Sequence, residues 1–128
     1  MVSIAPSSIA GEGLFAKKAI KKDAQVIEYV GRKIPTPVAD KLTTRYLFDL
    51  EDGWTIDGEI EGNVARYANH SCEPNCEARI EDGHIFFYAL RDIIPSEEIT
   101  IDYGKEYFDE FIAPSGCTCP RCAKNKNR

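Results

Sequence analysis

Short apolar stretches separated by turns run along most of the chain. Stretches rich in β-branched and aromatic residues have the length of strands at residues 25–30, 45–50, 54–57, 76–80, 84–90 and 98–102. Turn residues that end in glycine, at 51–53 and 81–83, predict a β-hairpin in two places. Helical periodicity is weak, with short candidates at 37–42, 63–68 and 105–111. The pattern predicts a mostly β fold with few short helices.

Length and composition limit the possible classes of protein. The 128 residues provide one core, and 43% hydrophobic with 29% charged residues is the balance of a soluble globular chain. The apolar runs are far shorter than the roughly 20 residues that cross a bilayer as a helix. The first ten residues lack the basic start of a signal peptide. We therefore expect an intracellular protein in a reducing compartment, without a membrane partner.

Charge is unevenly distributed along the chain. The net charge is −5, but residues 117–128 carry four basic and no acidic residues, so residues 1–116 sum to −9. Such an acidic body repels phosphate backbones, which argues against direct nucleic-acid binding. It attracts basic partners, such as a lysine-rich peptide. The alternative is that the acidic surface serves only solubility.

Five cysteines form two clusters, and their odd number argues against a disulfide framework. Cys117, Cys119 and Cys122 lie close enough to bind one tetrahedral zinc ion. A closed site needs a fourth ligand, for which the candidates are Cys72, Cys76, His70 and His84. The alternative is a set of free thiols in a flexible tail.

Two other motifs allow more than one interpretation. Residues 11–16 satisfy the dinucleotide-binding pattern G-x-G-x-x-A, but Pro6, Ser7 and Ser8 precede them where a buried parallel strand is required. We therefore reject a Rossmann fold. The polar stretch 66–76 places thiols near His70, which is compatible with a Cys–His nucleophile or with a structural turn capped by asparagines.

Four sequence blocks resemble SET-domain protein lysine methyltransferases. They are G-E-G-L-F at 11–15, I-E-Y-V-G at 27–31, G-N-V-A-R-Y-A-N-H-S-C-E-P-N-C at 62–76 and E-E-I-T-I-D-Y-G at 97–104. The resemblance covers residues 9–122 and implies a SET-domain fold of several small sheets around a pseudoknot. It also implies a minimal SET domain over 1–112, followed by a post-SET-like zinc-binding tail over 113–128.

The family transfers a methyl group from S-adenosylmethionine to a lysine amine of a protein. A free lysine has a pKa near 10.4 and must be desolvated before it can attack. The resemblance implies that Tyr103 and Tyr29 are catalytic. It implies a substrate channel formed by Tyr29, Tyr46, Ile101 and Tyr103.

Further residues correspond to the family's cofactor and metal sites. The implied contacts to S-adenosylmethionine are Ala10, Glu12, Gly13, Leu14, Tyr46, Arg66, Asn69, His70 and Tyr103. Arg66 has the alternative role of bracing this segment. The implied zinc ligands are Cys72, Cys117, Cys119 and Cys122, which leaves Cys76 as a core thiol. The tail spacing C-x-C-x2-C is shorter than the usual C-x-C-x4-C.

One position bears on how many methyl groups are added. In many SET enzymes, a tyrosine two residues before the catalytic tyrosine limits the product to fewer methyl groups. Here that position is Ile101, and a second such position is Ala78. Neither carries a hydroxyl, so we expect di- or trimethyl-lysine as the final product.

The sequence thus predicts a protein-lysine N-methyltransferase with a histone tail as substrate. The alternatives are an inactive SET module that binds a lysine-bearing peptide, and a zinc-dependent interaction module. A histone substrate predicts action in the nucleus, on chromatin, if the source is eukaryotic or the protein acts on a host, and in the cytoplasm otherwise. Two minimal domains can also complete each other's substrate groove, so a homodimer is a further hypothesis.

Overall fold

The computed structural model describes residues 2–9, 11–42 and 46–103 of the chain. Within these ranges the chain forms short strands arranged in small sheets, with little helix, which confirms the mostly β prediction. The strands are β1 (Val2–Pro6), β2 (Glu12–Ala16), β3 (Gln25–Tyr29), β4 (Arg32–Pro35), β5 (Leu47–Asp49), β6 (Trp54–Asp57), β7 (Asn69–His70), β8 (Cys76–Glu81), β9 (His84–Ala89) and β10 (Glu98–Ile101), and the helices are α1 (Thr36–Ala39) and the 3-10 helix η1 (Val64–Tyr67).

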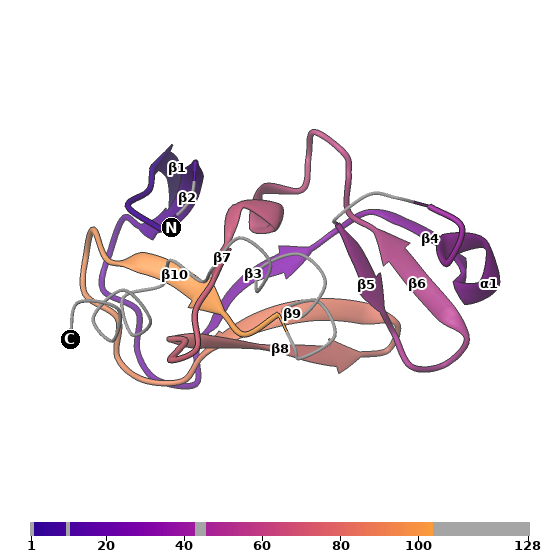
Figure 1. Ribbon diagram of the computed structural model, residues 1–128. Coiled ribbons are helices and arrows are strands. Elements are labelled where there is room, and N and C mark those ends of the chain that lie inside the picture. Colours follow the sequence, from indigo (N-terminus) through magenta and orange to yellow (C-terminus); the bar gives the residue numbers. More distant parts are fainter. Residues whose placement is uncertain (1, 10, 43–45, 104–128) are drawn as a thin grey trace.

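The three-stranded sheet β3-β9-β8 lies in the middle of the molecule (Figure 1). Its strands are antiparallel, and β8 and β9 form the hairpin expected around residues 81–83. Asp82 and Gly83 turn the chain with φ of 49° and 78°. Ile85, Phe87 and Ala89 are fully buried on one face of β9, because successive side chains of a strand point to opposite faces.

A second sheet, in the order β4-β6-β5, lies at one end of the molecule. The hairpin β5–β6 confirms the turn expected at 51–53, where Glu51 and Gly53 both have positive φ. Strand β4 was not expected, because charged residues and Pro35 give its sequence little resemblance to a strand. It occupies an edge of the sheet, where proline removes no hydrogen bond from a ladder interior.

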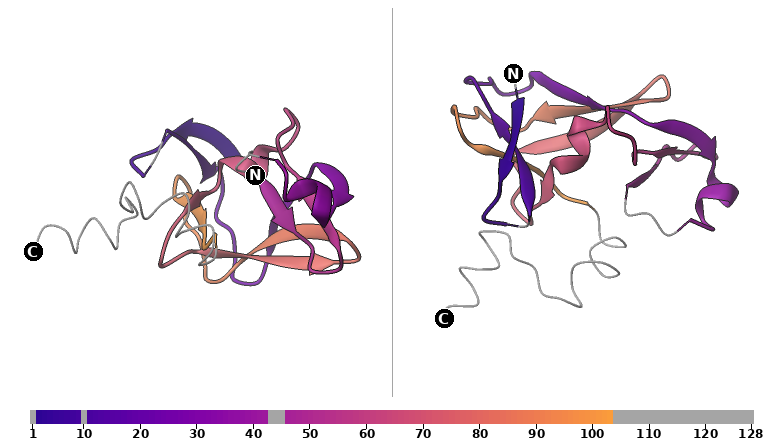
Figure 2. Two further views of the ribbon diagram at one scale, coloured as in Figure 1. Left: turned by 45° about the vertical axis from the view of Figure 1, so that its right-hand side comes forward. Right: turned by 90° about the horizontal axis from the view of Figure 1, so that it is seen from above.

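The third sheet has the order β1-β2-β10-β7, and its N-terminal hairpin β1–β2 lies at the opposite end of the molecule (Figures 1 and 2). Both hairpin strands were missed in the sequence. Residues 12–16 continue as a strand where a dinucleotide-binding motif would open a helix, which confirms its rejection. Strand β10 pairs antiparallel with β2 and parallel with β7. The third and fourth sequence blocks therefore lie side by side.

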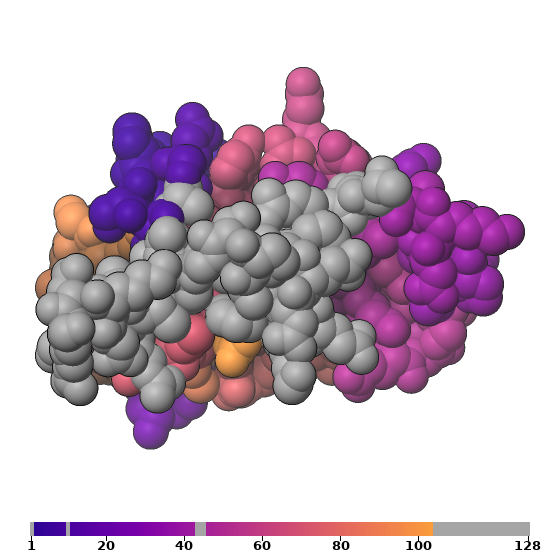
Figure 3. Space-filling view, in the orientation of Figure 1, coloured from indigo at the N-terminus to yellow at the C-terminus, as the bar shows by residue number. Residues whose placement is uncertain are grey.

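The core lies where the central sheet meets strands β2 and β10. Leu14, Phe87 and Ile99 are fully buried there, and each such side chain contributes roughly 1.5–3 kcal/mol by leaving water. Helix η1 packs against β2 and β3, which brings the beginning of the third sequence block next to the core. The space-filling view shows the indigo N-terminal residues near one end of this face and purple residues at the other end (Figure 3).

The helical expectations are confirmed in two places within the described ranges. The stretch 37–42 overlaps α1, which spans Thr36–Ala39, and 63–68 contains the 3-10 helix η1. The third candidate, 105–111, lies outside the described residues, as does the expected domain boundary between 112 and 113. In the part of the chain that the structure describes, no helix has the length and apolar character needed to cross a membrane.

Candidate active site

A cavity of about 110 Å3 opens between sheet β4-β6-β5, strand β10 and helix η1. On the same measure a single water needs about 10–15 Å3, so the cavity has room for an extended side chain. Its walls are mainly aromatic and apolar. They include all four residues expected to line a substrate channel, namely Tyr29, Tyr46, Ile101 and Tyr103.

Tyr103 is held at both its hydroxyl and its backbone. Its phenol donates a hydrogen bond to the carbonyl oxygen of Ala68, the residue that ends η1. Its backbone N–H donates to Nδ1 of His70 at 3.0 Å. The two rings also contact each other, with centroids 5.3 Å apart. The position of the phenol therefore depends on the turn from η1 into β7.

The same contacts fix the protonation state of His70. Burial lowers the pKa of His70, and the carboxylate of Asp102, 3.8 Å from Nδ1, opposes that shift. The ring is therefore neutral at pH 7. Since Nδ1 accepts the N–H of Tyr103, the proton lies on Nε2. Nε2 lies 3.5 Å from the sulfur of Cys72, toward which it donates.

Tyr29 also lines the cavity and is only 7% exposed. Its hydroxyl donates to the carbonyl oxygen of Tyr46 at 2.7 Å, and its ring packs beside Phe48 with centroids 5.6 Å apart. A Cβ on Gly58 would lie 2.4 Å from the hydroxyl oxygen of Tyr29, so this close approach requires glycine. Sequence reasoning missed Gly58, since its contact is with a distant strand.

Arg66 also lines the cavity while bracing the loop above it. Its guanidinium donates to the carbonyl oxygen of Ile60 at 3.0 Å and to the hydroxyl of Tyr67 at 2.9 Å. It also lies over the ring of Tyr46, 5.7 Å from the centroid. The contacts of Arg66 therefore brace this segment. Its position in the cavity wall is also compatible with a contact to S-adenosylmethionine.

Asn69 ties three separate segments together. Its amide donates to Oε2 of Glu98 at 2.8 Å, to Oγ of Ser7 at 3.2 Å and to the carbonyl oxygen of Glu12 at 3.2 Å. Ser7 donates in turn to the carboxylate of Glu98 at 2.8 Å. A Cβ on Gly13 would lie 2.4 Å from Oε2 of Glu98, so a larger residue there would push the Glu98 carboxylate away from its present position. Ser7 and Glu98 were missed, because their partners are far away in sequence.

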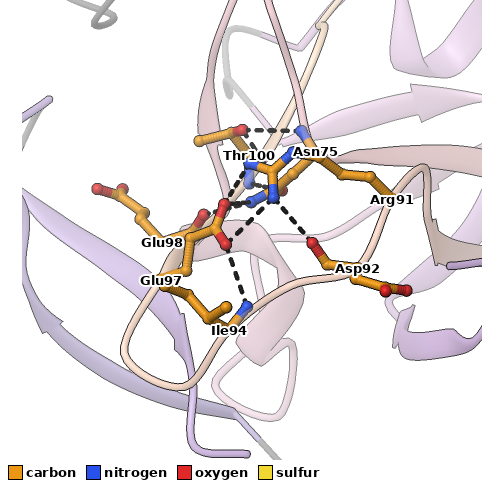
Figure 4. A network of polar contacts seen from close by, with 7 residues as sticks. All are labelled: Asn75, Arg91, Asp92, Ile94, Glu97, Glu98 and Thr100. Atoms are coloured by element: carbon orange, nitrogen blue, oxygen red, sulfur yellow. Dashed lines mark hydrogen bonds and ion pairs between the residues drawn. The ribbon is translucent and has the colours of Figure 1, made fainter. Parts of the chain in front are cut away.

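A second asparagine fastens β10 to the segment that follows β7 (Figure 4). Asn75 is buried, and its Oδ1 accepts the backbone N–H of Thr100 at 2.9 Å while its Nδ2 donates to the carbonyl oxygen of Glu98 at 2.7 Å. Nδ2 also reaches Glu97, which pairs with Arg91 at the surface. This network fixes the strand that carries Ile101 and leads into Tyr103.

Comparison with known protein families shows to which family this chain belongs. The family model of the SET domain matches residues 11–104, more than half of the chain. The chain belongs to the SET-domain family. The mostly β architecture in several small sheets is consistent with that family, and the four sequence blocks fall inside the matched range or at its edges.

The curated relatives of this SET domain are named as histone-lysine N-methyltransferases. The chain is 38% identical over 138 residues to "Histone-lysine N-methyltransferase trithorax" of Drosophila virilis, covering 98% of this chain. It is 40% identical over 136 residues to "Histone-lysine N-methyltransferase, H3 lysine-4 specific" of Saccharomyces cerevisiae, covering 94% of this chain. It is also 39% identical over 134 residues to "Histone-lysine N-methyltransferase set1" of Dictyostelium discoideum. The alignments cover 4%, 13% and 9% of these relatives, so the chain corresponds to a small part of each.

The remaining residues implied by the SET resemblance lie in different parts of the structure. Glu12 and Gly13 begin β2, whereas Leu14 is fully buried in the core between β1 and β10. Ile101 and Ala78, the two positions connected with product methylation, both line the cavity. Ala10 lies outside the described residues.

Two of the five cysteines of the SET chain lie in the described part. Cys76 is fully buried in the core, as expected, and burial raises the pKa of its thiol to about 12. Cys72 is half-buried beside His70. The other implied zinc ligands, Cys117, Cys119 and Cys122, lie outside the described residues, and the described part contains no cluster of three or more metal-ligating side chains.

Proposed function

We propose that this SET domain transfers a methyl group from S-adenosylmethionine to a lysine side chain of a protein. The observation that carries the proposal is the narrow cavity walled by Tyr29, Tyr46 and Tyr103, beside the Asn69–His70 strand. The names of the relatives support a histone as the substrate. An acidic body also favours a basic tail over a nucleic acid.

The cavity suits the chemistry that a lysine amine requires. Apolar and aromatic walls disfavour the charged ammonium, so they lower the pKa of an inserted lysine from its usual value near 10.4. The phenols of Tyr29 and Tyr103 donate their protons to main-chain carbonyls. Their oxygens therefore meet the amine as hydrogen-bond acceptors, which orients the nitrogen for attack. The proton leaves to solvent before the nitrogen becomes a nucleophile.

Several of the residues implied to hold S-adenosylmethionine fit this arrangement. Tyr46, Arg66 and Tyr103 belong both to that set and to the cavity wall, so cofactor and amine would meet at a shared boundary. Glu12, Asn69 and His70 belong to the same set and lie in the described part of the chain. The bound cofactor would supply an electrophilic methyl group on a sulfonium. The chain itself supplies desolvation, orientation and exclusion of water.

A zinc ion in the tail is part of the same proposal. Four thiolates are a closed structural donor set for Zn2+. Cys72 is the described member, and its half-buried sulfur, 3.5 Å from Nε2 of His70, is compatible with a place in that set. The ion would couple folding of residues 113–128 to the metal. Metal analysis of freshly reduced protein should find close to one zinc per chain, and less than about half an equivalent would contradict the assignment.

Transfer of a labelled methyl group tests the proposed activity. Purified protein is incubated with labelled S-adenosylmethionine and a mixture of histones, beside Tyr103→Phe. Label on a lysine, lost in Tyr103→Phe, supports the methyltransferase. Cofactor binding without transfer would support the alternative, an inactive module that binds a lysine-bearing peptide.

Assembly and location follow as smaller proposals. We propose a homodimer in which each copy completes the substrate groove of the other, and light scattering that shows only monomer at assay concentration would exclude it. A histone substrate further predicts action at chromatin in a eukaryotic cell, which imaging of the tagged protein tests.

A further inference from the structure

A wide groove of about 640 Å3 adjoins the tyrosine cavity. Phe48, Ala78 and Asp102 line both spaces, so the groove lies directly beside the cavity. Its walls come from the end of β5, the turn that follows, and strand β8. A chain segment that places a lysine in the cavity therefore has its neighbouring residues in this groove.

The charged side chains that line the groove are all acidic. They are Asp49, Glu51, Glu77 and Asp102. Glu77 pairs with Arg79 at 2.7 Å, but within the described residues no cation pairs with Asp49 or Glu51. Oδ1 of Asp49 accepts the backbone N–H of Glu51 at 2.7 Å, which holds the two carboxylates on one turn. A cleft lined by one sign of charge focuses the field on that cleft.

The groove also offers apolar surface beside the acids. Ile80 and Leu90 line it and are 40% and 36% exposed. Arginine and lysine place their methylene stems on apolar surface while their charged ends remain in water or meet carboxylates. The combination of these side chains and four acids is therefore complementary to a long basic side chain.

We propose that this groove selects lysine substrates that carry a basic residue close to the target lysine, with Asp49 and Glu51 as specificity-determining residues. The inference rests on the proposed methyltransferase function, since it extends the same site. Nucleic acid is a poor occupant, because four carboxylates repel phosphates. A divalent cation is also a poor occupant, because the described residues contain no group of three or more acidic or histidine side chains positioned around one point.

Binding of matched synthetic peptides tests this inference without requiring turnover. Each labelled peptide carries norleucine at the target position, flanked by arginine, glutamine or glutamate, and is titrated by fluorescence anisotropy in the presence of S-adenosylmethionine. The arginine peptide should bind about 5- to 10-fold more tightly than the glutamine peptide, the size expected for two partly solvated charge pairs. High salt should reduce this ratio, because exposed charges are screened.

The variant Asp49→Asn/Glu51→Gln removes both charges, while the amide oxygen of the introduced asparagine keeps the acceptor of the turn. It should reduce the arginine-to-glutamine ratio to within about 2-fold. The control Asp40→Asn/Glu61→Gln removes two charges that do not line the groove, and it should leave the ratio unchanged. Equal binding of the arginine and glutamine peptides to the wild type, or an unaltered ratio in Asp49→Asn/Glu51→Gln, would overturn the inference.

A parallel assay separates this inference from the proposed function. The same peptides with lysine at the target position are incubated with labelled cofactor. Methylation of arginine and glutamine peptides with the same kcat/KM contradicts the selectivity and leaves the methyltransferase proposal intact. Selective binding without any transfer, also absent with whole histones, contradicts the methyltransferase proposal and retains the selectivity of the groove.

Discussion

Replacing Asn75 with alanine should strongly destabilise the domain. The side chain is only 3% exposed, and it is the acceptor for the Thr100 N–H at 2.9 Å and the donor to the Glu98 carbonyl at 2.7 Å. Alanine would leave both backbone groups without that partner in a buried site. Each unsatisfied group costs about 1–3 kcal/mol, so we expect the free energy of unfolding to fall by about 2–6 kcal/mol.

Urea unfolding, followed by circular dichroism and by the fluorescence of Trp54, the single tryptophan, measures this loss. The control is Asp92→Asn, which lies beside the same network but is exposed and keeps its acceptor for the Lys22 N–H. It should change stability by less than about 0.5 kcal/mol. A loss below about 1 kcal/mol in Asn75→Ala, or one equal to that of the control, would refute the anchoring role.

Three further predictions concern charge, product and thiol. The ion pair with Arg91 lowers the pKa of Glu97, so the stability that the pair contributes is present above about pH 4.3 and is lost as the pH falls further. In unfolding titrations from neutral pH to about pH 3, the free energy of unfolding of Arg91→Gln should therefore fall less steeply than that of the wild type. An unchanged slope would contradict this. Ile101→Tyr adds bulk and a water-binding hydroxyl to the cavity. Mass spectrometry at long reaction times should therefore show a shift of the product from di- or trimethyl-lysine toward monomethyl-lysine. A wild-type enzyme that stops at one methyl group would contradict the expectation. Cys76, with its pKa raised to about 12, should react with iodoacetamide at pH 8 far more slowly in folded than in urea-unfolded protein by peptide mapping, and equal rates would show that it is not buried.

The hairpins β5–β6 and β8–β9 could be predicted because their information is local. Strand β9 alternates buried and more exposed residues, a turn with Gly83 at positive φ joins it to β8, and both signals are visible in the sequence. Strand β2 was missed for the opposite reason. Gly13 has low strand propensity, and its close contact with the carboxylate of Glu98 comes from a strand distant in sequence.

The candidate site likewise contains residues that the sequence identifies and residues that only the fold identifies. Family resemblance identified the tyrosines, and the structure brings all four expected channel residues to one cavity. Ser7, Gly58 and Glu98 could not be found in the sequence, because each acts through a partner on another element. Their residue types are common in turns and on surfaces, so only the folded arrangement distinguishes them.

Filling the cavity tests most directly whether a lysine enters it. Ala78 lines the cavity from strand β8 and is partly buried, so Ala78→Phe adds a ring inside it without altering Asn69 or His70. Transfer of labelled methyl to histones should be lost in this variant, while its circular dichroism and its binding of S-adenosylmethionine remain those of the wild type. Transfer by Ala78→Phe at the wild-type rate would contradict the assignment of this cavity as the lysine channel.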